Sequence, residues 1–154
     1  MDTKTNEMLV THSISTKNGQ NEQLEKIFSS SGQLIAYIVY RNYKSERTEF
    51  ITHDNLNLQV GFIVYPQNGM IQRHDHRPIE RHILGTQEVL IVRSGQLEME
   101  LYDESREFVD KRILNEGDVI IIISGGHGFR ILKDTVLLEI KQGPYVNIYE
   151  KEYF

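Results

Sequence analysis

Hydrophobic and polar residues alternate over short segments through most of this chain. From Leu34 onward the segments are rich in β-branched and aromatic residues, and turn-forming residues separate them, as at 66–69 and 115–118. The strands predicted from this pattern cover residues 34–41, 48–52, 58–65, 70–76, 88–94, 96–102, 108–114, 119–124, 128–132 and 136–141. About ten short strands with turns between them are typical of an all-β sandwich or barrel. We therefore predict an all-β fold.

The two ends of the chain do not follow this pattern. Residues 1–31 are mostly polar, and we interpret them as an N-terminal arm, with a frayed tail as the alternative. Within the arm, residues 22–28 predict two short helical turns, which the serine-rich stretch 29–32 would end. Pro144 ends the last strand. The predicted domains are therefore the arm, a β-barrel over 32–145 and a C-terminal tail over 146–154.

Composition excludes several classes of protein. A chain of 154 residues with 39% hydrophobic and 25% charged residues suits one ordinary soluble domain. Its apolar runs, such as 119–123, are far shorter than the about 20 residues of a membrane-spanning helix. The net charge is −5 and no cluster of Lys and Arg stands out, so we expect neither a nucleic-acid nor a membrane partner. There is no cysteine and no apolar N-terminal signal, so we expect a cytoplasmic protein.

Histidines supply the first candidate chemistry. His74 and His76 are two residues apart on a predicted strand, so both imidazoles point to one face, which Gln72 shares. Two imidazoles placed in this way can reach one cation at about 2.0–2.1 Å. Taken alone, such a pair is also explained as two polar surface residues.

Two later residues extend the candidate site. Glu88 begins an apolar segment, where a carboxylate is costly to bury unless it is paired or bound to a metal. His127 follows the most hydrophobic predicted strand and lies between two glycines, which leave room around its ring. Each is explained singly as a solvated glutamate or a hydrogen-bonded loop histidine. Together, three imidazoles and one carboxylate suit a divalent transition metal.

With these residues in place, the sequence resembles the cupin superfamily. Its first motif corresponds to Gly69, His74, His76, Glu88 and Gly95, and its second to residues 117–127, from Gly-Asp through an apolar strand to the last histidine. The resemblance covers roughly residues 56–142. It implies a single-domain jelly-roll β-barrel, also called a double-stranded β-helix. It also implies one divalent metal per chain (Fe, Mn, Ni or Zn), held by three histidines and one glutamate.

The sequence departs from the family pattern in both motifs. Glu88 lies farther from His76 than in many cupins, and Glu80 matches the shorter spacing instead. Glu80 lacks the apolar strand and glycine that should follow it, so we favour Glu88 as the ligand. In the second motif Ile123 replaces the usual proline, the turn before the histidine is shorter, and the trailing asparagine is absent.

The connection 77–87 is long for a hairpin, and such connections are often functional. If it covers the barrel mouth, Glu80 and His82 are the candidate catalytic acid and base. Gln72, Arg81 and Arg130 are the candidate substrate-binding residues, although strand alternation separates Arg130 from the face of the last histidine. The alternative for 77–87 is a solvated charged loop.

Three functions follow from these residues. The first is a metalloenzyme, of the isomerase, epimerase or dioxygenase type, acting on a small polar substrate. The ending 140–145 resembles small cupins of bacterial surface-polysaccharide biosynthesis, which implies a sugar or sugar-nucleotide. The second is a non-catalytic cupin that binds a small ligand or a metal in a regulatory or scaffolding role. The third is a structural protein with incidental histidines. In each case we expect a homodimer.

Overall fold

The computed structural model describes residues 23–146 and 150–154, and its regular elements are strands. They are β1 (Leu24–Phe28), β2 (Leu34–Val39), β3 (Glu49–Phe50), β4 (Gly61–Phe62), β5 (Glu88–Tyr102), β6 (Phe108–Asn115), β7 (Val119–Ile122) and β8 (Gly126–Lys141). The described part of the chain is thus all-β, as predicted. It contains no helix long and apolar enough to cross a membrane.

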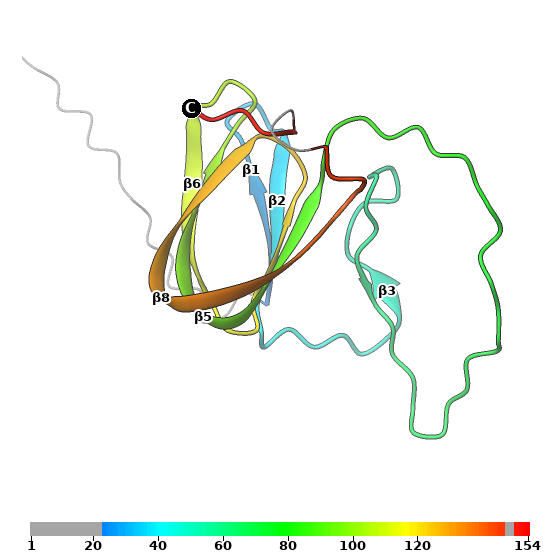
Figure 1. Ribbon diagram of the computed structural model, residues 1–154. Coiled ribbons are helices and arrows are strands. Elements are labelled where there is room, and N and C mark those ends of the chain that lie inside the picture. The colour runs from blue at the N-terminus through cyan, green and yellow to red at the C-terminus, as the bar shows by residue number, and fades with distance from the viewer. Residues whose placement is uncertain (1–22, 147–149) are drawn as a thin grey trace, which may run out of the picture.

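One antiparallel sheet holds most of the strands, in the order β1-β2-β7-β5-β6, and it curls strongly into a half-barrel (Figure 1). The long strand β5 lies beside β7 along its first part and beside β6 along its last part. On its opposite side β5 pairs with β8 over almost its full length. Register shifts between Val92 and Leu97 interrupt this pairing, and such irregularities let a long strand bend. The β5–β8 ribbon therefore curves round on itself.

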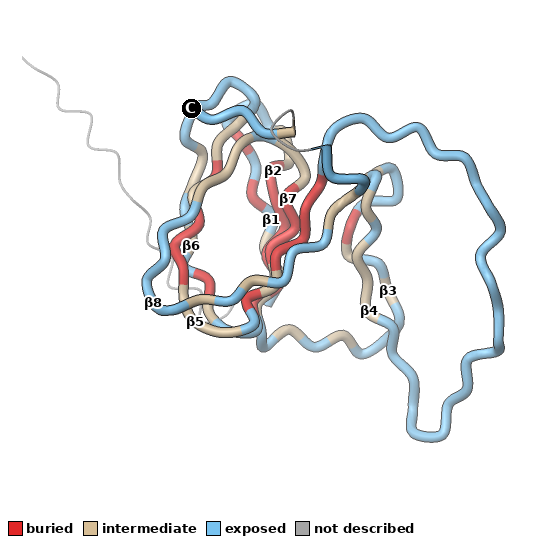
Figure 2. The backbone as a smooth tube through the Cα atoms, viewed as in Figure 1, coloured by how far each residue is buried: buried red, intermediate tan, exposed pale blue. Residues whose placement is uncertain are grey.

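The sheet buries side chains on both faces because successive residues of a strand point to opposite sides. The inner face of the half-barrel holds the larger cluster, which includes Ile38, Leu97, Met99, Leu101 and Ile120 (Figure 2). The outer face holds a smaller cluster, which is covered by the two-stranded sheet β3–β4 and the segment between these strands. Its buried residues are Tyr37, Val39, Val89 and Ile121.

An ion pair joins the two ends of the sheet. Arg112 on β6 donates from Nη2 to Glu25 Oε1 on β1 at 2.7 Å, and from Nε to Oε2 at 3.2 Å. Tyr40, just after β2, donates its hydroxyl to the same carboxylate at 2.8 Å. Since β1 and β6 are not neighbours in the sheet, these contacts link strands that backbone hydrogen bonds do not.

Several predicted elements differ from the observed ones. Residues 24–28 form β1 and not helical turns, because their backbone pairs with β2 and Ile27 enters the core. The segments 88–94 and 96–102 are one continuous strand, as are 128–132 and 136–141. Residues 70–76 are not a strand. Residues 1–22 of the predicted arm, and 147–149 of the predicted tail, lie outside the described residues.

The segment 65–84, here called the outer loop, extends to the side of the half-barrel next to β3 (Figure 1). Every one of its residues is exposed (Figure 2). It is held at its two ends, where Thr48 Oγ1 accepts a hydrogen bond from the backbone of Val64, and Asn57 Nδ2 donates to the carbonyl oxygen of Leu84. The outer loop is thus fixed at its base and solvated along its length.

Candidate functional site

Glu88 and His127 meet at one open end of the half-barrel, where β5 begins and the two ends of β8 come together. This end is here called the mouth. Glu88 is the first residue of β5, on the inner face with Leu90, and His127 is near the start of β8, opposite Leu101. In the register of the β5–β8 ribbon these two positions are at opposite ends. The curl of the ribbon brings the ends together, so that His127 Nε2 lies 3.3 Å from Glu88 Oε2. Tertiary curvature, and not strand pairing, makes this contact.

The Glu88–His127 pair is shielded from water. The side chains are 10% and 24% exposed. Burial lowers the pKa of His127 below its ordinary value, and the charge of Glu88 opposes this shift without cancelling it. The imidazole is therefore neutral at pH 7, which is the state in which histidine binds metals. A buried carboxylate beside a neutral imidazole has the donor chemistry of a transition-metal site.

One lysine lies among three carboxylates at the mouth. Lys141 Nζ lies 3.8 Å from Glu88 Oε1, 3.4 Å from Glu139 Oε1 and 3.5 Å from Glu150 Oε1. Its ammonium group also lies over the ring of Tyr145, 4.8 Å from the centroid. Desolvation opposes the charge of Lys141, but the three carboxylates outweigh it and raise the pKa of its side chain. Lys151 also acts electrostatically on His127, so three carboxylates and two ammonium groups leave the mouth with a small net negative charge.

Two buried polar atoms at the mouth lack a hydrogen-bond partner among the described residues: Gln142 Nε2 and Glu150 Oε2. The other polar atom of each side chain, its Oε1, is hydrogen-bonded. Gln142 Oε1 accepts from the backbone of Gln87 at 2.8 Å, and Glu150 Oε1 accepts from Thr86 Oγ1 at 3.3 Å. An unpaired buried donor or acceptor costs about 1–3 kcal/mol. Both atoms are shielded from solvent, so they would serve a polar ligand only where the chain around them opens.

The other two predicted ligands lie elsewhere. His74 and His76 are on the outer loop, with ring centroids 5.4 Å apart, and His74 Nδ1 lies 2.9 Å from the carbonyl oxygen of Gln72. The structure thus brings His74 to His76 and Glu88 to His127, but keeps the two pairs apart. Within the described residues no group of three His, Asp or Glu side chains is placed to hold a metal. The four-ligand site stays a prediction.

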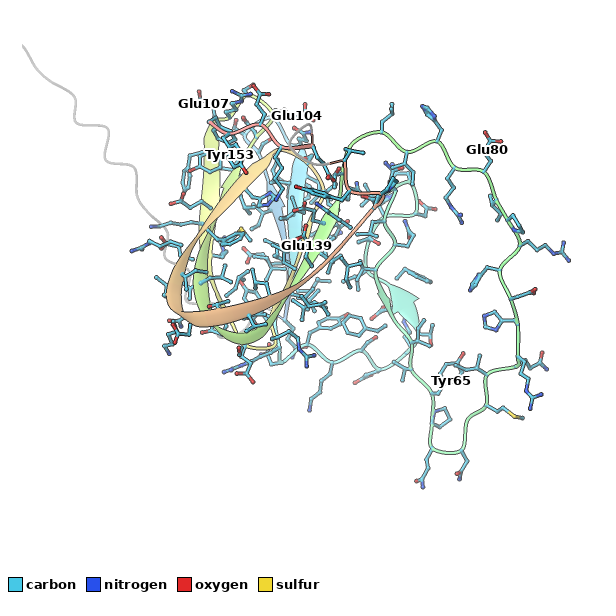
Figure 3. The ribbon with its side chains drawn as sticks, in the orientation of Figure 1. Tyr65, Glu80, Glu104, Glu107, Glu139 and Tyr153 are labelled. Carbon is cyan, nitrogen blue, oxygen red and sulfur yellow. The ribbon has the colours of Figure 1, made fainter. Side chains whose placement is uncertain are left out.

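The predicted catalytic and substrate-binding residues are also away from the mouth. Gln72, Glu80, Arg81 and His82 are exposed on the outer loop. Figure 3 places Glu80 on this loop and Glu139 at the half-barrel. Arg130 lies on the outer face, where its Nη2 donates to Glu98 Oε1 at 2.9 Å. In one chain, therefore, none of these five side chains contacts the Glu88–His127 pair.

Sequence reasoning missed Glu139, Lys141 and Glu150. Glu139 and Lys141 are two residues apart in the otherwise apolar stretch 136–141 and so share a face. The burial cost that singled out Glu88 applies to Lys141, which is 17% exposed, and less to Glu139, which is 41% exposed. Glu150 follows the strand region and carries no comparable signal in its surroundings.

Another cavity, of about 430 Å³, opens on the outer face of the sheet, away from the mouth. It is lined by residues of β1, β2 and the loops that cover them, including Lys26, Tyr37, His53 and Leu56. Lys26 Nζ lies over the Tyr37 ring and His53 pairs with Asp54, so the two cationic or ionisable side chains of its lining already have partners.

The donor set at the mouth fits a transition metal in chemistry, but two ligands from one chain fall short of the three or four that such sites use. No family model, curated protein or solved structure matches the chain.

Proposed function

We propose that this protein is a cupin that binds one divalent transition metal per chain and acts as a metalloenzyme on a small polar substrate. Glu88 and His127 are the part of the ligand set present at the barrel mouth, and His74 and His76 complete it. One observation carries the proposal. A carboxylate and an imidazole from opposite ends of the β5–β8 ribbon meet at 3.3 Å in a shielded position, and burial keeps the imidazole neutral.

The metal would supply Lewis acidity, polarising a carbonyl or hydroxyl of the substrate. The chain's own groups would bind and orient that substrate. Gln142 Nε2 and Glu150 Oε2 would supply a hydrogen-bond donor and acceptor once the chain around them opens. Lys141 presents a positive charge at the mouth, which three carboxylates already share. A sugar suits such hydrogen-bonding groups, and the anionic part of a sugar-nucleotide would take its cations from the outer loop, Arg73, Arg77 and Arg81.

The outer-loop residues would serve the reaction only when the loop reaches a mouth. There Glu80 and His82 are the proposed proton-transfer groups, because both are of a type that exchanges protons near neutral pH when suitably placed. Gln72 and Arg81, together with Arg130, are the proposed substrate-binding groups. We further propose that the protein works in the cytoplasm.

The position of Lys141 favours a second candidate. Its ammonium group already balances the charge of Glu88, so the carboxylate does not require a metal in order to be buried. A non-catalytic cupin that holds a small ligand, in a regulatory or scaffolding role, would use the same mouth. The two candidates differ in turnover and not in the place of binding.

Metal analysis of protein purified without a histidine tag tests the proposal. About one transition-metal ion per chain is expected, and both His127→Ala and Glu88→Gln should lose it. Binding should weaken below about pH 6, because ligating imidazoles must be neutral. Wild-type protein that takes up none of Ni²⁺, Fe²⁺, Mn²⁺ or Zn²⁺ would refute metal binding.

A panel of sugar-nucleotides then separates the two candidates. Turnover by the metal-loaded wild type that Glu88→Gln abolishes supports the enzyme. Saturable ligand binding without turnover supports the non-catalytic cupin. Arg47→Ala, in an exposed ion pair with Glu49, is the matched control and should leave both metal content and ligand binding unchanged.

A further inference from the structure

The outer loop has the composition of a segment that a binding partner covers. It exposes large apolar side chains, of which Met70 is 86% and Ile71 55% accessible, and Ile79 is more exposed than Ile71. Between residues 70 and 83, no backbone hydrogen bond to another described segment is formed. An extended chain with free backbone groups and exposed apolar side chains is an unpaired strand edge on both sides.

Strand β8 offers a matching surface. It pairs with β5 along one side only, so its other edge is open over its whole length within the described residues. Apolar side chains stay 36–58% exposed on both of its faces. They are Phe129, Ile131, Leu132, Val136, Leu138 and Ile140. Such an edge pairs readily with an added strand.

Charge also favours pairing between these two surfaces. The outer loop carries Arg73, Arg77 and Arg81 against two acidic residues. The mouth that β8 borders has three carboxylates around Lys141, and Lys151 acts on His127 beside them. The loop is therefore net positive by one charge and the mouth net negative by one, so their charges attract weakly and do not oppose the encounter.

The occupant of the β8 edge is better supplied by a second copy than by the same chain. The loop is anchored through Val64 and Leu84 beside β3, on the outer side of the sheet, and extends away from its own mouth (Figure 1). Each chain has one projecting segment and one open edge. In a pair of identical copies each segment can bind the edge of the other copy, so two equivalent contacts form. Exchange of an identical element in this way is a low-cost route to a symmetric dimer.

We infer that two copies of this chain exchange their outer loops, each adding residues 70–76 as a strand to the open edge of β8 in the other. As a strand, this stretch puts Gln72, His74 and His76 on one face. Turned toward the mouth, that face brings both imidazoles to the Glu88–His127 pair of the other copy. The inference rests on the proposed metal binding, and it explains why one chain holds only half of the ligand set.

Complementation between two defective copies tests this directly. One copy carries His74→Ala and His76→Ala, and the other carries Glu88→Gln and His127→Ala. Each alone should lose Ni²⁺ binding. A heterodimer refolded from both, and purified through two different tags that bind no metal, should recover about half of the wild-type Ni²⁺ per chain, since one of its two sites is intact. A wild type that binds Ni²⁺ with no recovery in the heterodimer would overturn the exchange and leave metal binding standing.

The oligomeric state supplies a readout that does not depend on metal. Wild-type protein should have about twice the 18.0 kDa mass of one chain by light scattering. Met70→Asp with Ile71→Asp should give a monomer, because both side chains are solvated in the single chain and buried on exchange. Tyr153→Asp is the matched control, since this residue is also highly exposed but far from the loop in sequence, and the dimer should persist.

These results separate the two proposals. A dimer that the paired aspartates disrupt, in a protein that takes up no Ni²⁺, supports the exchange and refutes metal binding. A wild-type monomer, or a dimer unaffected by the paired aspartates, overturns the exchange whatever the metal content.

Discussion

The Glu25–Arg112 ion pair should contribute more to stability than an ordinary surface pair. The two side chains are only 13% and 17% exposed, and Arg112 also donates to Asp110 Oδ1 at 2.6 Å. Arg112→Met leaves the Glu25 carboxylate with the Tyr40 hydroxyl as its one remaining side-chain partner. Stranding a buried charge costs about 3–5 kcal/mol. Because both side chains keep some exposure, the loss of unfolding free energy in Arg112→Met should lie at the lower end of this range, about 3 kcal/mol.

A double-mutant cycle measures this coupling. Glu25→Leu should cost less, about 1–2 kcal/mol, because the guanidinium keeps its ion pair with Asp110. The double variant should lose about 3 kcal/mol in total and not the sum, because two apolar groups of similar size then pack together. Urea unfolding followed by circular dichroism, at one fixed protein concentration, gives all three values. For a domain of this length, 3 kcal/mol corresponds to about 6–12 °C in melting temperature.

An equally short but solvated pair is the control. Arg106 Nη2 lies 2.8 Å from Glu152 Oε1, with side chains 47% and 81% exposed. Its coupling energy should be below about 1 kcal/mol. If the coupling between Glu25 and Arg112 is no larger than this, the ion pair does not hold the two ends of the sheet together.

Three further predictions concern the turn glycines and the mouth. Gly95 has φ 93° and a Cβ there would lie 2.2 Å from a backbone oxygen, so Gly95→Ala should cost more than about 2 kcal/mol of unfolding free energy. Gly32, with φ 84° and open space, is its control, and an equal loss in Gly32→Ala would show that the clash is unimportant. Lys141→Met removes the ammonium group that competes for Glu88, so Ni²⁺ should bind at least tenfold tighter in a calorimetric titration, and weaker binding would contradict this role. Burial lowers the pKa of His127 from its ordinary 6.5, so its contribution to stability is present above pH 6.5 and lost as the pH falls through the folded-state pKa. Urea midpoints from pH 7 to 5 should therefore fall less steeply in metal-free His127→Gln than in metal-free wild type, and parallel curves would show that the imidazole is not buried as a neutral group.

Local pattern was sufficient for most of the sheet. Strand alternation has a period of two residues and depends only on which side chains face the core, so 34–41, 108–114 and 119–124 were predicted close to their observed bounds. The same reasoning predicted short helical turns over 22–28. The spacing of apolar residues there is compatible with a helix, but the backbone pairs with β2, which follows after one turn. This pairing supplies hydrogen bonds that compensate better than an isolated helical turn does, because short isolated helices are marginal in water.

What the sequence determined by itself is the all-β class, most strand segments of the large sheet and the residues worth testing as ligands, because these depend on neighbours along the chain. Only the tertiary structure decided that Glu88 meets His127 and Lys141. That contact requires a ribbon with register shifts near its middle to curl until its two ends touch. It also decided that His74 and His76 stand apart on a solvated loop, since strand formation needs a partner edge, and residues 70–76 find none within their own described chain.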